Sequence, residues 1–236
     1  MRSSRVLRLG VLLTALGVAS FVLSNAAYFR VHEIRVKEST RVPKEEILAL
    51  SGLSIGMHIY SFDPRRVEAA ICKNPWIHTA TVTRSLPGLV SISTSMRQPI
   101  AAIPHYSGFF LIDSDARVVD FQDGGQVLYP VITGYDSGNT LAGDFIKHPS
   151  VLAGLRCLES LTPEITAQLS EVNVDKEGEV TLFLVGGLRV FIGQADAQTE
   201  RKARTLESLL EDIRKSSLSA LHVDLRYEQP VIRLRD

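Results

Sequence analysis

A long apolar run near the start of the chain separates a short basic tail from everything that follows. Residues 9–29 contain no charged side chain. At about 1.5 Å per residue, a helix of this length matches a hydrocarbon core of roughly 30 Å. Arg2, Arg5 and Arg8 precede the run, and short basic tails tend to stay in the cytoplasm. The pattern predicts a cytoplasmic tail over residues 1–8, one transmembrane helix over Leu9–Phe29 and an exported remainder.

A cleavable signal peptide is the alternative for the same run. Leu9 to Leu23 has the length of a signal-peptide apolar region, and Ser24-Asn25-Ala26 offers small residues at the spacing of a cleavage site. The apolar run continues beyond that site, however, and the rings of Tyr28 and Phe29 suit a membrane interface. The residues alone favour a retained anchor and leave the signal peptide open. In both cases the rest of the chain leaves the cytoplasm.

The first exported segment shows alternation and helix signals in the order β-α-α-β-β. The expected elements are a strand at 32–36, a helix from Pro43 that Gly52 ends, a helix opened by Asp63-Pro64, and strands at 76–83 and 90–96. In the second strand, Trp76, His78, Ala80 and Val82 alternate with Ile77 and three threonines. The two last strands flank a turn at Leu86-Pro87-Gly88, which predicts a hairpin.

The remainder of the chain mixes short strands with two longer helical patterns. A meander is expected at 100–103, 109–112 and 118–121, followed by an extended segment at 127–133. Helical periodicity appears at 151–161, with Ile165 and Leu169 extending it, and strands are expected at 172–174, 180–184 and 188–192. A helix from Asp196 to Ser216 and strands at 221–227 and 231–234 complete the pattern. Pro230 suits the first residue of an edge strand, where no ladder donor is required. The predicted fold class is α+β, with a mixed sheet and helices in this second part.

Composition narrows the choice of function without identifying one. Lysine and arginine (26) balance aspartate and glutamate (26), so no overall field attracts a polyanion such as nucleic acid. Only Cys72 and Cys157 are present, each within a helical pattern, and they are expected to be small core residues rather than a disulfide framework. About 200 exported residues are enough for two small domains.

The first exported segment resembles a POTRA domain, specifically the one in the FtsQ/DivIB division proteins. The residues that carry the resemblance are Gly52-x3-Gly56, Asp63 at the opening of the second helix, and Asn74-Pro75-Trp76-Ile77-x2-Ala80-x-Val82-x-Arg84. The chain departs from the family at Leu86, where an aromatic residue is usual, and at Met96, where an acid is frequent. The resemblance implies a POTRA domain over residues 30–98.

The second exported segment looks like the C-terminal β domain that accompanies POTRA in the same family. The matching residues are Leu169-Ser170-Glu171-Val172, Gly187-Leu188-Arg189-Val190-x2-Gly193, Lys202, and Val223-Asp224-Leu225-Arg226-Tyr227. This domain is assigned to residues 99–236, so the resemblance covers essentially the whole chain. Because the family is bitopic, the resemblance implies that Leu9–Phe29 is a retained anchor in the cell inner membrane, with the bulk of the chain in the periplasm.

Catalytic and metal-binding patterns were sought and found only in unsuitable contexts. Gly52-Leu53-Ser54-Ile55-Gly56 has the spacing of a nucleophile elbow, but a helix precedes it where a strand is needed. Asp113-x-Asp115 begins like a calcium loop and lacks its glycine, which favours a hairpin turn. The six histidines are scattered, and no catalytic residue, metal or cofactor is expected. Lys202, Arg201 and Arg204 are expected to form a solvated helix face, with an ionic contact to a partner as the second interpretation.

The resemblance implies a non-enzymatic divisome scaffold at the septum that links early and late division proteins. Family members bind the FtsB and FtsL pair, and the implied contact is strand addition along the edge of the last strand. Carried over position by position, the contact segment comprises Arg226, Tyr227, Gln229, Pro230, Val231 and Ile232. Arg226 would pair with a partner carboxylate and Tyr227 would be an aromatic anchor. Pro230 replaces the small residue usual in the family and removes a backbone donor. The POTRA domain is implied to serve recruitment through other division proteins.

Two alternatives belong to other classes of protein. A POTRA domain also occurs in outer-membrane assembly and secretion factors, but these carry a β-barrel, and helical patterns follow Gln98 instead of repeated ten-residue alternation. A serine hydrolase built on Ser54 is the third class. Filamentous cells after depletion would support division, whereas loss of outer-membrane proteins would support assembly.

Overall fold

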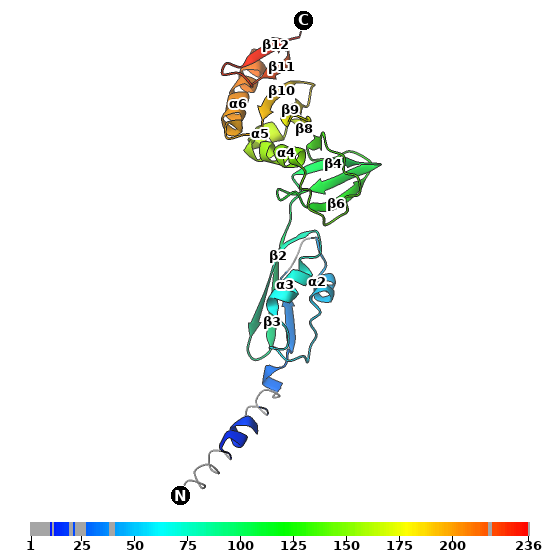
Figure 1. The fold of residues 1–236 in the computed structure, drawn as a ribbon, viewed down its shortest axis with the longest axis vertical. Helices are drawn as coiled ribbons and strands as arrows, with labels where there is room; N and C mark the ends of the chain where they lie inside the picture. Colours follow the sequence, from blue (N-terminus) through cyan, green and yellow to red (C-terminus); the bar gives the residue numbers. More distant parts are fainter. Residues whose placement is uncertain are drawn as a thin grey trace. The chain divides into compact units, whose positions relative to one another are not determined.

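The chain forms two compact units in a computed structural model that describes residues 10, 12–18, 21, 27–37, 41–216 and 219–235. The first unit is Met1–Met96 and the second is Arg97–Asp236 (Figure 1). Each unit has its own cluster of buried apolar side chains. The expected α+β class is confirmed, because each unit combines helices with one sheet.

Nine of the 21 residues of the predicted transmembrane segment, and the whole cytoplasmic tail, lie outside the described residues. Residues 10, 12–18 and 21 are helical, and large apolar side chains such as Leu16 and Phe21 are exposed there. No helix among the described residues combines the length and the hydropathy of a membrane span. The retained anchor therefore stays a prediction.

The described part of the first unit has the predicted β-α-α-β-β order after a short 3-10 turn. Its elements are η1 (Ala27–Phe29), β1 (Glu33–Val36), α2 (Lys44–Ser51), α3 (Pro64–Ile71), β2 (Ile77–Ser85) and β3 (Leu89–Met96). The sheet order is β1-β3-β2, with β1 parallel and β2 antiparallel to β3. Both helices cover one face of this sheet (Figure 1).

The helix ends of the first unit follow the signals in the sequence. The Asp63 carboxylate accepts a hydrogen bond from the Arg65 N–H at 3.0 Å, and Pro64 occupies the first turn. Gly52 ends α2 in the left-handed conformation that glycine adopts without steric cost. Ile47 of α2 and Ile71 of α3 are fully buried with Ile92 of β3. Capping and periodicity thus bring the two apolar helix faces onto the sheet.

A bulge changes the face that the start of β2 presents. The sequence pattern placed His78 on the same side as Val82. A register shift between Ile77 and Thr79 interrupts the ladder with β3, so Ile77 is fully buried and His78 is exposed. Because a bulge inserts one residue into one strand, side chains before it face the opposite way from the expected alternation.

The described part of the second unit is built on one mixed sheet. Its strands are β4 (Ala101–His105), β5 (Gly108–Ile112), β6 (Val118–Asp123), β7 (Val131–Thr133), β8 (Leu169–Val174), β9 (Glu179–Leu184), β10 (Arg189–Gln194), β11 (Ala220–Asp224) and β12 (Val231–Leu234). They lie in the order β12-β11-β10-β9-β8-β7-β4-β5-β6. The meander of β4, β5 and β6 is confirmed, and β12 is an edge strand as expected.

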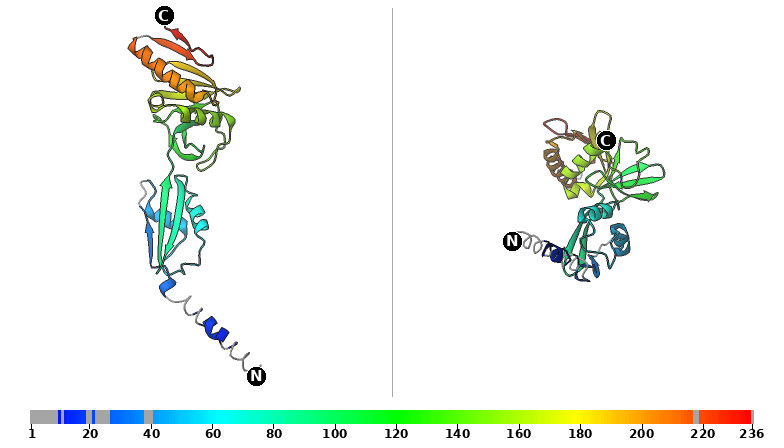
Figure 2. Two further views of the ribbon diagram at one scale, coloured as in Figure 1. Left: turned by 90° about the vertical axis from the view of Figure 1, so that its left-hand side faces the viewer. Right: turned by 60° about the horizontal axis from the view of Figure 1, so that its bottom comes forward.

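Three helices accompany this sheet in the described residues: α4 (Pro149–Ser160), α5 (Pro163–Thr166) and α6 (Thr199–Lys215). The long helix α6 lies across β10 and contacts α4 (Figure 2). Leu206 of α6 is fully buried against a core that includes Leu182 and Ile192. The expected extension of the helical region through Leu169 is wrong, because the chain turns after α5 and Leu169 begins β8.

A buried ion pair holds the start of the second unit. Arg97 and Asp113 are both almost completely buried and their side chains are hydrogen-bonded. The Arg97 Nη1 also lies 2.9 Å from Asp115 Oδ2, and the Asp113 carboxylate accepts the Arg117 N–H at 2.8 Å. The hairpin turn expected at Asp113-x-Asp115 is therefore confirmed, and it also neutralises a buried arginine.

Candidate partner-binding site

The free edge of β12 offers unpaired backbone groups beside exposed apolar side chains. In the described chain, β12 pairs with β11 on one side and no strand lies on the other. Val231, Ile232 and Leu234 are 50%, 38% and 44% exposed. Proteins usually shorten or charge such an edge, because it invites pairing with another chain. This edge can accept an added strand.

The turn between β11 and β12 carries the other predicted contact residues. The sequence placed Leu225 and Tyr227 in a strand, but β11 ends at Asp224 and residues 226–229 form a turn. Leu225 is buried, whereas Tyr227 is 63% exposed. An edge strand needs a reversal before it, and Pro230 stands at the end of this turn, directly before β12. Tyr227 therefore lies in the turn that leads into β12, where it lines a cleft with residues of α6, and not within the sheet.

Arg226 is held in place by carboxylates of its own chain. Its Nε donates to Asp224 Oδ1 at 3.0 Å and its Nη2 donates to Asp224 Oδ2 at 2.7 Å. Its Nη1 lies 3.3 Å from Glu179 Oε2, and the guanidinium carbon lies 5.2 Å from the centre of the Phe191 ring. The hydrogen bonds from Arg226 hold the pKa of Asp224 below its usual range, and Asp224 raises the pKa of Arg226. The guanidinium is thus preoriented before any partner arrives.

A polar cleft of about 450 Å³ lies between this turn and α6, and Lys202, Arg226, Tyr227 and Pro230 help to line it. The Lys202 ammonium donates to the Ile192 carbonyl at 2.6 Å. A Cβ added to Gly193 would lie 3.1 Å from Arg226 Cγ and 3.8 Å from Lys202 Nζ. The bare backbone of Gly193 thus lets two cations approach over β10. A carboxylate entering this cleft would meet both.

The three basic residues expected to form one solvated face of α6 have different environments. Arg204 is exposed and pairs with Glu200 one turn earlier, and Arg201 donates to Gln198 at 3.0 Å. Lys202 is partly buried against β10. Arg201 and Lys202 both line the cleft, whereas Arg204 does not. Only the packing of α6 on the sheet brings these two residues to the cleft. In the sequence, only the match to the family motif had distinguished Lys202 from the neighbouring basic residues.

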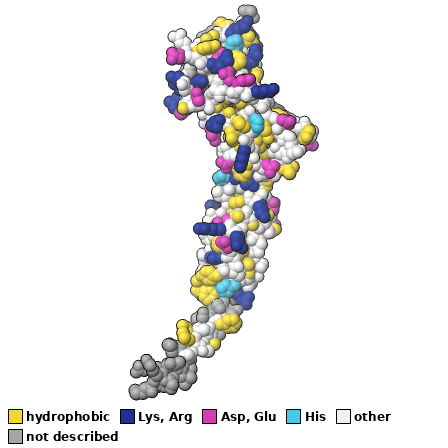
Figure 3. Space-filling view, in the orientation of Figure 1, with side chains coloured by type: hydrophobic (Ala, Val, Ile, Leu, Met, Phe, Trp, Pro, Cys, Tyr) yellow, Lys and Arg dark blue, Asp and Glu magenta, His cyan; other side chains and the backbone are white. Residues whose placement is uncertain are grey.

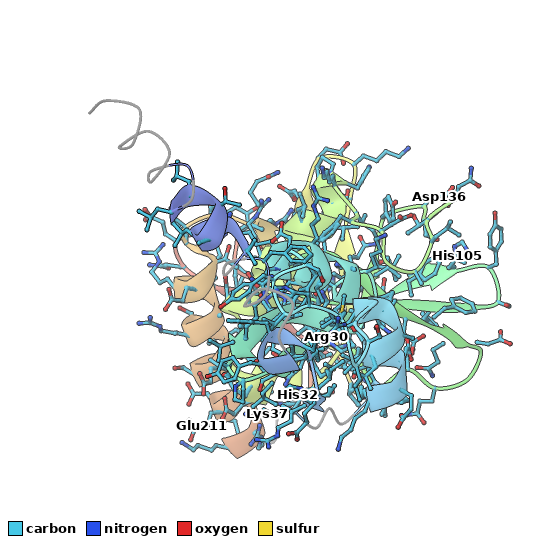
Figure 4. The ribbon with its side chains drawn as sticks, turned by 90° about the horizontal axis from the view of Figure 1, so that it is seen from below. Arg30, His32, Lys37, His105, Asp136 and Glu211 are labelled. Atoms are coloured by element: carbon cyan, nitrogen blue, oxygen red, sulfur yellow. The ribbon has the colours of Figure 1, made fainter. Side chains whose placement is uncertain are left out.

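The residue patterns examined for catalysis do not form a reactive site. Ser54 is exposed in a loop after α2, where its N–H contacts the Met57 sulfur. A serine and a histidine do meet elsewhere, with His105 Nδ1 2.8 Å from Ser137 Oγ near the protruding turn seen in Figure 4. That serine is buried and donates to the Pro104 carbonyl, so it is not available as a nucleophile. The described residues contain no group of three metal-ligating side chains.

The two cysteines lie apart and unbridged. Cys157 is buried and Cys72 is half-buried, which confirms the expectation of small core residues. Burial raises the pKa of the Cys157 thiol to about 12, although the nearby Lys202 opposes this shift. A thiol in that environment is a weak nucleophile at neutral pH.

Family models match both units of the chain. Residues 29–93 match the model described as "POTRA domain, FtsQ-type", and residues 101–226 match "Cell division protein FtsQ/DivIB, C-terminal". Together these matches cover most of the described residues, and the second alone spans more than half of the chain.

Similar proteins from two bacteria carry the name cell division protein FtsQ. The chain is 28% identical to the cell division protein FtsQ of Geotalea daltonii over 98% of this chain and 86% of that protein. It is 31% identical to the FtsQ of Syntrophotalea carbinolica over 87% of this chain and 74% of that protein. A solved structure of the major extracytoplasmic domain of DivIB from Geobacillus stearothermophilus aligns with 51% of this chain and 97% of that one at 16% identity, with a TM-score of 0.37, too low to support any argument.

Proposed function

Because the chain belongs to the FtsQ/DivIB family of cell division proteins, we propose that it is a non-enzymatic scaffold of the inner membrane that binds the FtsB and FtsL pair at the division septum. In this role it links early and late division proteins and helps to recruit the machinery that builds the septal wall. The tail over residues 1–8 faces the cytoplasm, the anchor is Leu9–Phe29, and the two units lie in the periplasm. Family membership weighs against the outer-membrane assembly alternative.

The observation that carries the proposal is the open, apolar edge of β12. An extended partner segment would add to this edge through backbone hydrogen bonds, with Val231 and Ile232 as side-chain contacts. Main-chain pairing supplies affinity with little sequence preference, so specificity must come from the neighbouring side chains. Gln229 and Pro230 flank the start of this edge, and the missing donor at Pro230 limits pairing to the residues after it.

Tyr227 and the cations of the cleft are positioned to supply that specificity. Tyr227 is exposed in the turn that leads into the edge strand, and tyrosine is enriched among residues that dominate interface energies. Arg226 is already paired with Asp224, so a partner carboxylate would add to a preoriented guanidinium and would compete only with the longer contact to Glu179. Lys202 lies within the same cleft. The arrangement favours a partner segment that combines a β-strand with an acidic residue.

The test is binding of purified FtsB and FtsL to the full chain and to single variants. Tyr227→Ala is expected to weaken binding at least about tenfold, because it removes a central aromatic contact. Tyr106→Ala is the matched control, since Tyr106 is a more exposed tyrosine of the same unit at the turn between β4 and β5. A chain ending before Glu228 lacks β12 and should not bind.

Undiminished binding by Tyr227→Ala and by the truncated chain would rule out this interface. Circular dichroism of both variants would establish that the second unit remains folded. Depletion of the protein in cells is the broader test: filaments support a division role, and normal division would contradict it.

A further inference from the structure

Five aromatic and histidine side chains gather at one end of the first unit, where the chain emerges from the apolar run. This basal cluster consists of Tyr28, Phe29, His58, Tyr60 and Phe62. The Phe29 ring lies 5.4 Å from Tyr28, 6.0 Å from His58 and 6.3 Å from Tyr60 between ring centres. These residues come from η1 and from the loop between α2 and α3.

Phe29 and Phe62 of this cluster pack against the core of the unit, whereas its two tyrosines are largely in contact with solvent. Tyr28 is 54% exposed and Tyr60 is 57% exposed. Ile55 and Leu86, at the same end, are also exposed. The loop that carries Ile55 is tied to the segment just before β1, because the Gly56 N–H donates to the Val31 carbonyl at 2.7 Å. The turn that carries Leu86 is tied there too, since Gly88 accepts the His32 N–H at 2.9 Å.

Two arginines, Arg84 and Arg30, lie close to the basal cluster. The Arg84 guanidinium carbon lies 5.5 Å from the Tyr60 ring centre and 4.4 Å from that of Phe62, and it also donates to the Phe62 carbonyl. Arg30 is exposed, and one of its nitrogens donates to the Gly56 carbonyl at 2.9 Å. Figure 3 shows an apolar patch beside basic and histidine side chains at this end, and Figure 4, viewed from below, shows Arg30 and His32 there.

The neighbouring acidic residues do not balance these cations at the cluster. Glu33 is paired with Arg35 at 2.6 Å, and the Asp63 carboxylate lies 3.9 Å from the Nε of Arg66. The surface therefore combines exposed rings with net positive charge. Tyrosine rings favour the interface between hydrocarbon and water, and arginine forms bidentate contacts with phosphate.

Phe29 links the basal cluster directly to the apolar run, so it fixes which end of the first unit lies nearest the proposed anchor. It is the last residue of the uncharged run and at the same time a member of the basal cluster. If the run crosses the membrane, the cluster has no chain length available to separate it from the bilayer surface. Negative surface charge of a leaflet attracts basic residues held within a Debye length of it.

We propose that the basal cluster, together with Arg30, Arg84, Ile55 and Leu86, is a docking face for anionic lipid headgroups. The inference rests on the proposed membrane anchor and extends it: the anchor holds the first unit near the bilayer, and the docking face fixes which side of that unit meets the lipid. The edge of β1 and the helices α2 and α3 then remain accessible to protein partners.

The test uses the full chain reconstituted in vesicles, with tryptophan fluorescence as the reporter. Trp76, the one tryptophan of the chain, precedes β2, whereas the cluster lies beyond the other end of that strand, about 30 Å away for nine residues. The wild-type chain therefore reports on the far end of the unit. Tyr60→Trp in a Trp76→Phe background moves the reporter into the cluster. Vesicles contain phosphatidylcholine and phosphatidylglycerol in equal amounts, with or without bromine in the upper acyl chains.

Brominated lipid is expected to at least halve the emission of the tryptophan at position 60 and to leave the emission of Trp76 unchanged. Arg30→Glu should relieve most of this quenching, whereas Lys73→Glu, an exposed charge change beside Trp76, should not. Vesicles of phosphatidylcholine alone should also relieve it. Equal quenching in those vesicles would overturn the anionic-headgroup contact.

Flotation of the same vesicles separates the two proposals. A chain that floats with the vesicles while the tryptophan at position 60 stays unquenched would overturn the docking face and leave the anchor intact. A chain that fails to float would overturn the anchor and the docking face with it. Circular dichroism of the Tyr60→Trp and Arg30→Glu variants confirms that each observed loss concerns a folded unit.

Discussion

Asp224 determines how Arg226 is presented to a partner. The carboxylate accepts the Arg226 backbone N–H at 3.0 Å as well as two nitrogens of its guanidinium. Asp224 is nearly buried, whereas Arg226 is two-fifths exposed, so solvent screens part of this ion pair. The pair thus orders the turn before β12 more than it stabilises the unit.

Asp224→Asn should lower the free energy of unfolding at neutral pH by about 1 kcal/mol, because the Arg226 guanidinium then pairs with a neutral amide in place of a carboxylate. The pKa of Asp224 is lowered in the folded state, so its contribution is complete above the ordinary carboxyl pKa of about 4 and is lost as the pH falls through the lower folded value. Urea unfolding of wild type and variant across this range measures the difference. Glu228→Gln, which removes a carboxylate from the same exposed turn, is the control and should leave the free energy of unfolding at neutral pH unchanged.

Cys157 should be inert in the native protein. Its burial raises the thiol pKa to about 12, which leaves little thiolate at neutral pH. Iodoacetamide is expected to modify Cys72 faster than Cys157, and Cys157 only after denaturation, as mass spectrometry of proteolytic peptides would show. Equal native rates would mean that α4 opens readily.

Two glycines that follow strands of the large sheet show two different reasons why a position requires glycine, namely a left-handed backbone and a lack of space for a Cβ. Gly134 follows β7 with φ of 90°, and a Cβ there would lie 1.8 Å from the Val174 carbonyl oxygen. Gly186 follows β9 with φ of 96° but has nothing within 4 Å. Alanine at either position would strain the backbone, but only alanine at Gly134 would also collide with a neighbouring atom.

Gly134→Ala is expected to cost about 3 kcal/mol or more, and Gly186→Ala about 1–2 kcal/mol, since the second carries only the left-handed strain. Urea unfolding of the two variants measures both values. Similar losses would show that the backbone at Gly134 moves away from Val174 without difficulty.

The turn after β5 is expected to be the most sensitive polar site of the second unit. Asp113→Ala should cost about 3–5 kcal/mol, because it leaves Arg97 charged and buried without its main partner. Asp115→Ala should cost about 1 kcal/mol or less, because that side chain is half exposed. Thermal unfolding compares them, and equal effects would mean that Asp115 can replace Asp113.

At the scale of the whole molecule, two separate cores serve two proposed tasks. The first unit carries the lipid-facing cluster and the second carries the partner edge. The apolar run before Ala27 is what would tie both units to the membrane, and its described leucines are exposed and belong to neither core.

Carbonate extraction tests that tie. The full chain should stay in the membrane pellet at high pH. Charge repulsion at that pH releases peripheral proteins but does not extract a transmembrane helix. A chain beginning at Arg30 should appear in the soluble fraction. Expression of the full chain that yields a soluble product with a new N-terminus at Ala27 would instead establish a cleaved signal peptide.

Several features of the fold were predictable because they depend on nearby residues. The caps at Asp63-Pro64 and Gly52, the hairpin at Leu86-Pro87-Gly88 and the edge position of β12 follow from local conformational preferences. For the predicted contact segment, the sequence located Val231 and Ile232 correctly on the edge strand, but it placed Tyr227 in a strand although Tyr227 lies in the turn. Its role in binding stays a prediction.

By itself, the sequence determined the order and type of the elements and the family, since periodicity and turn chemistry act over a few residues. Only the tertiary structure decided that Ile77 replaces His78 in the core, that Arg97 meets Asp113, and that Lys202 approaches Arg226 over Gly193. The physical reason is that strand register and helix packing bring together residues tens of positions apart, and the free energy of those contacts depends on burial that no local pattern specifies.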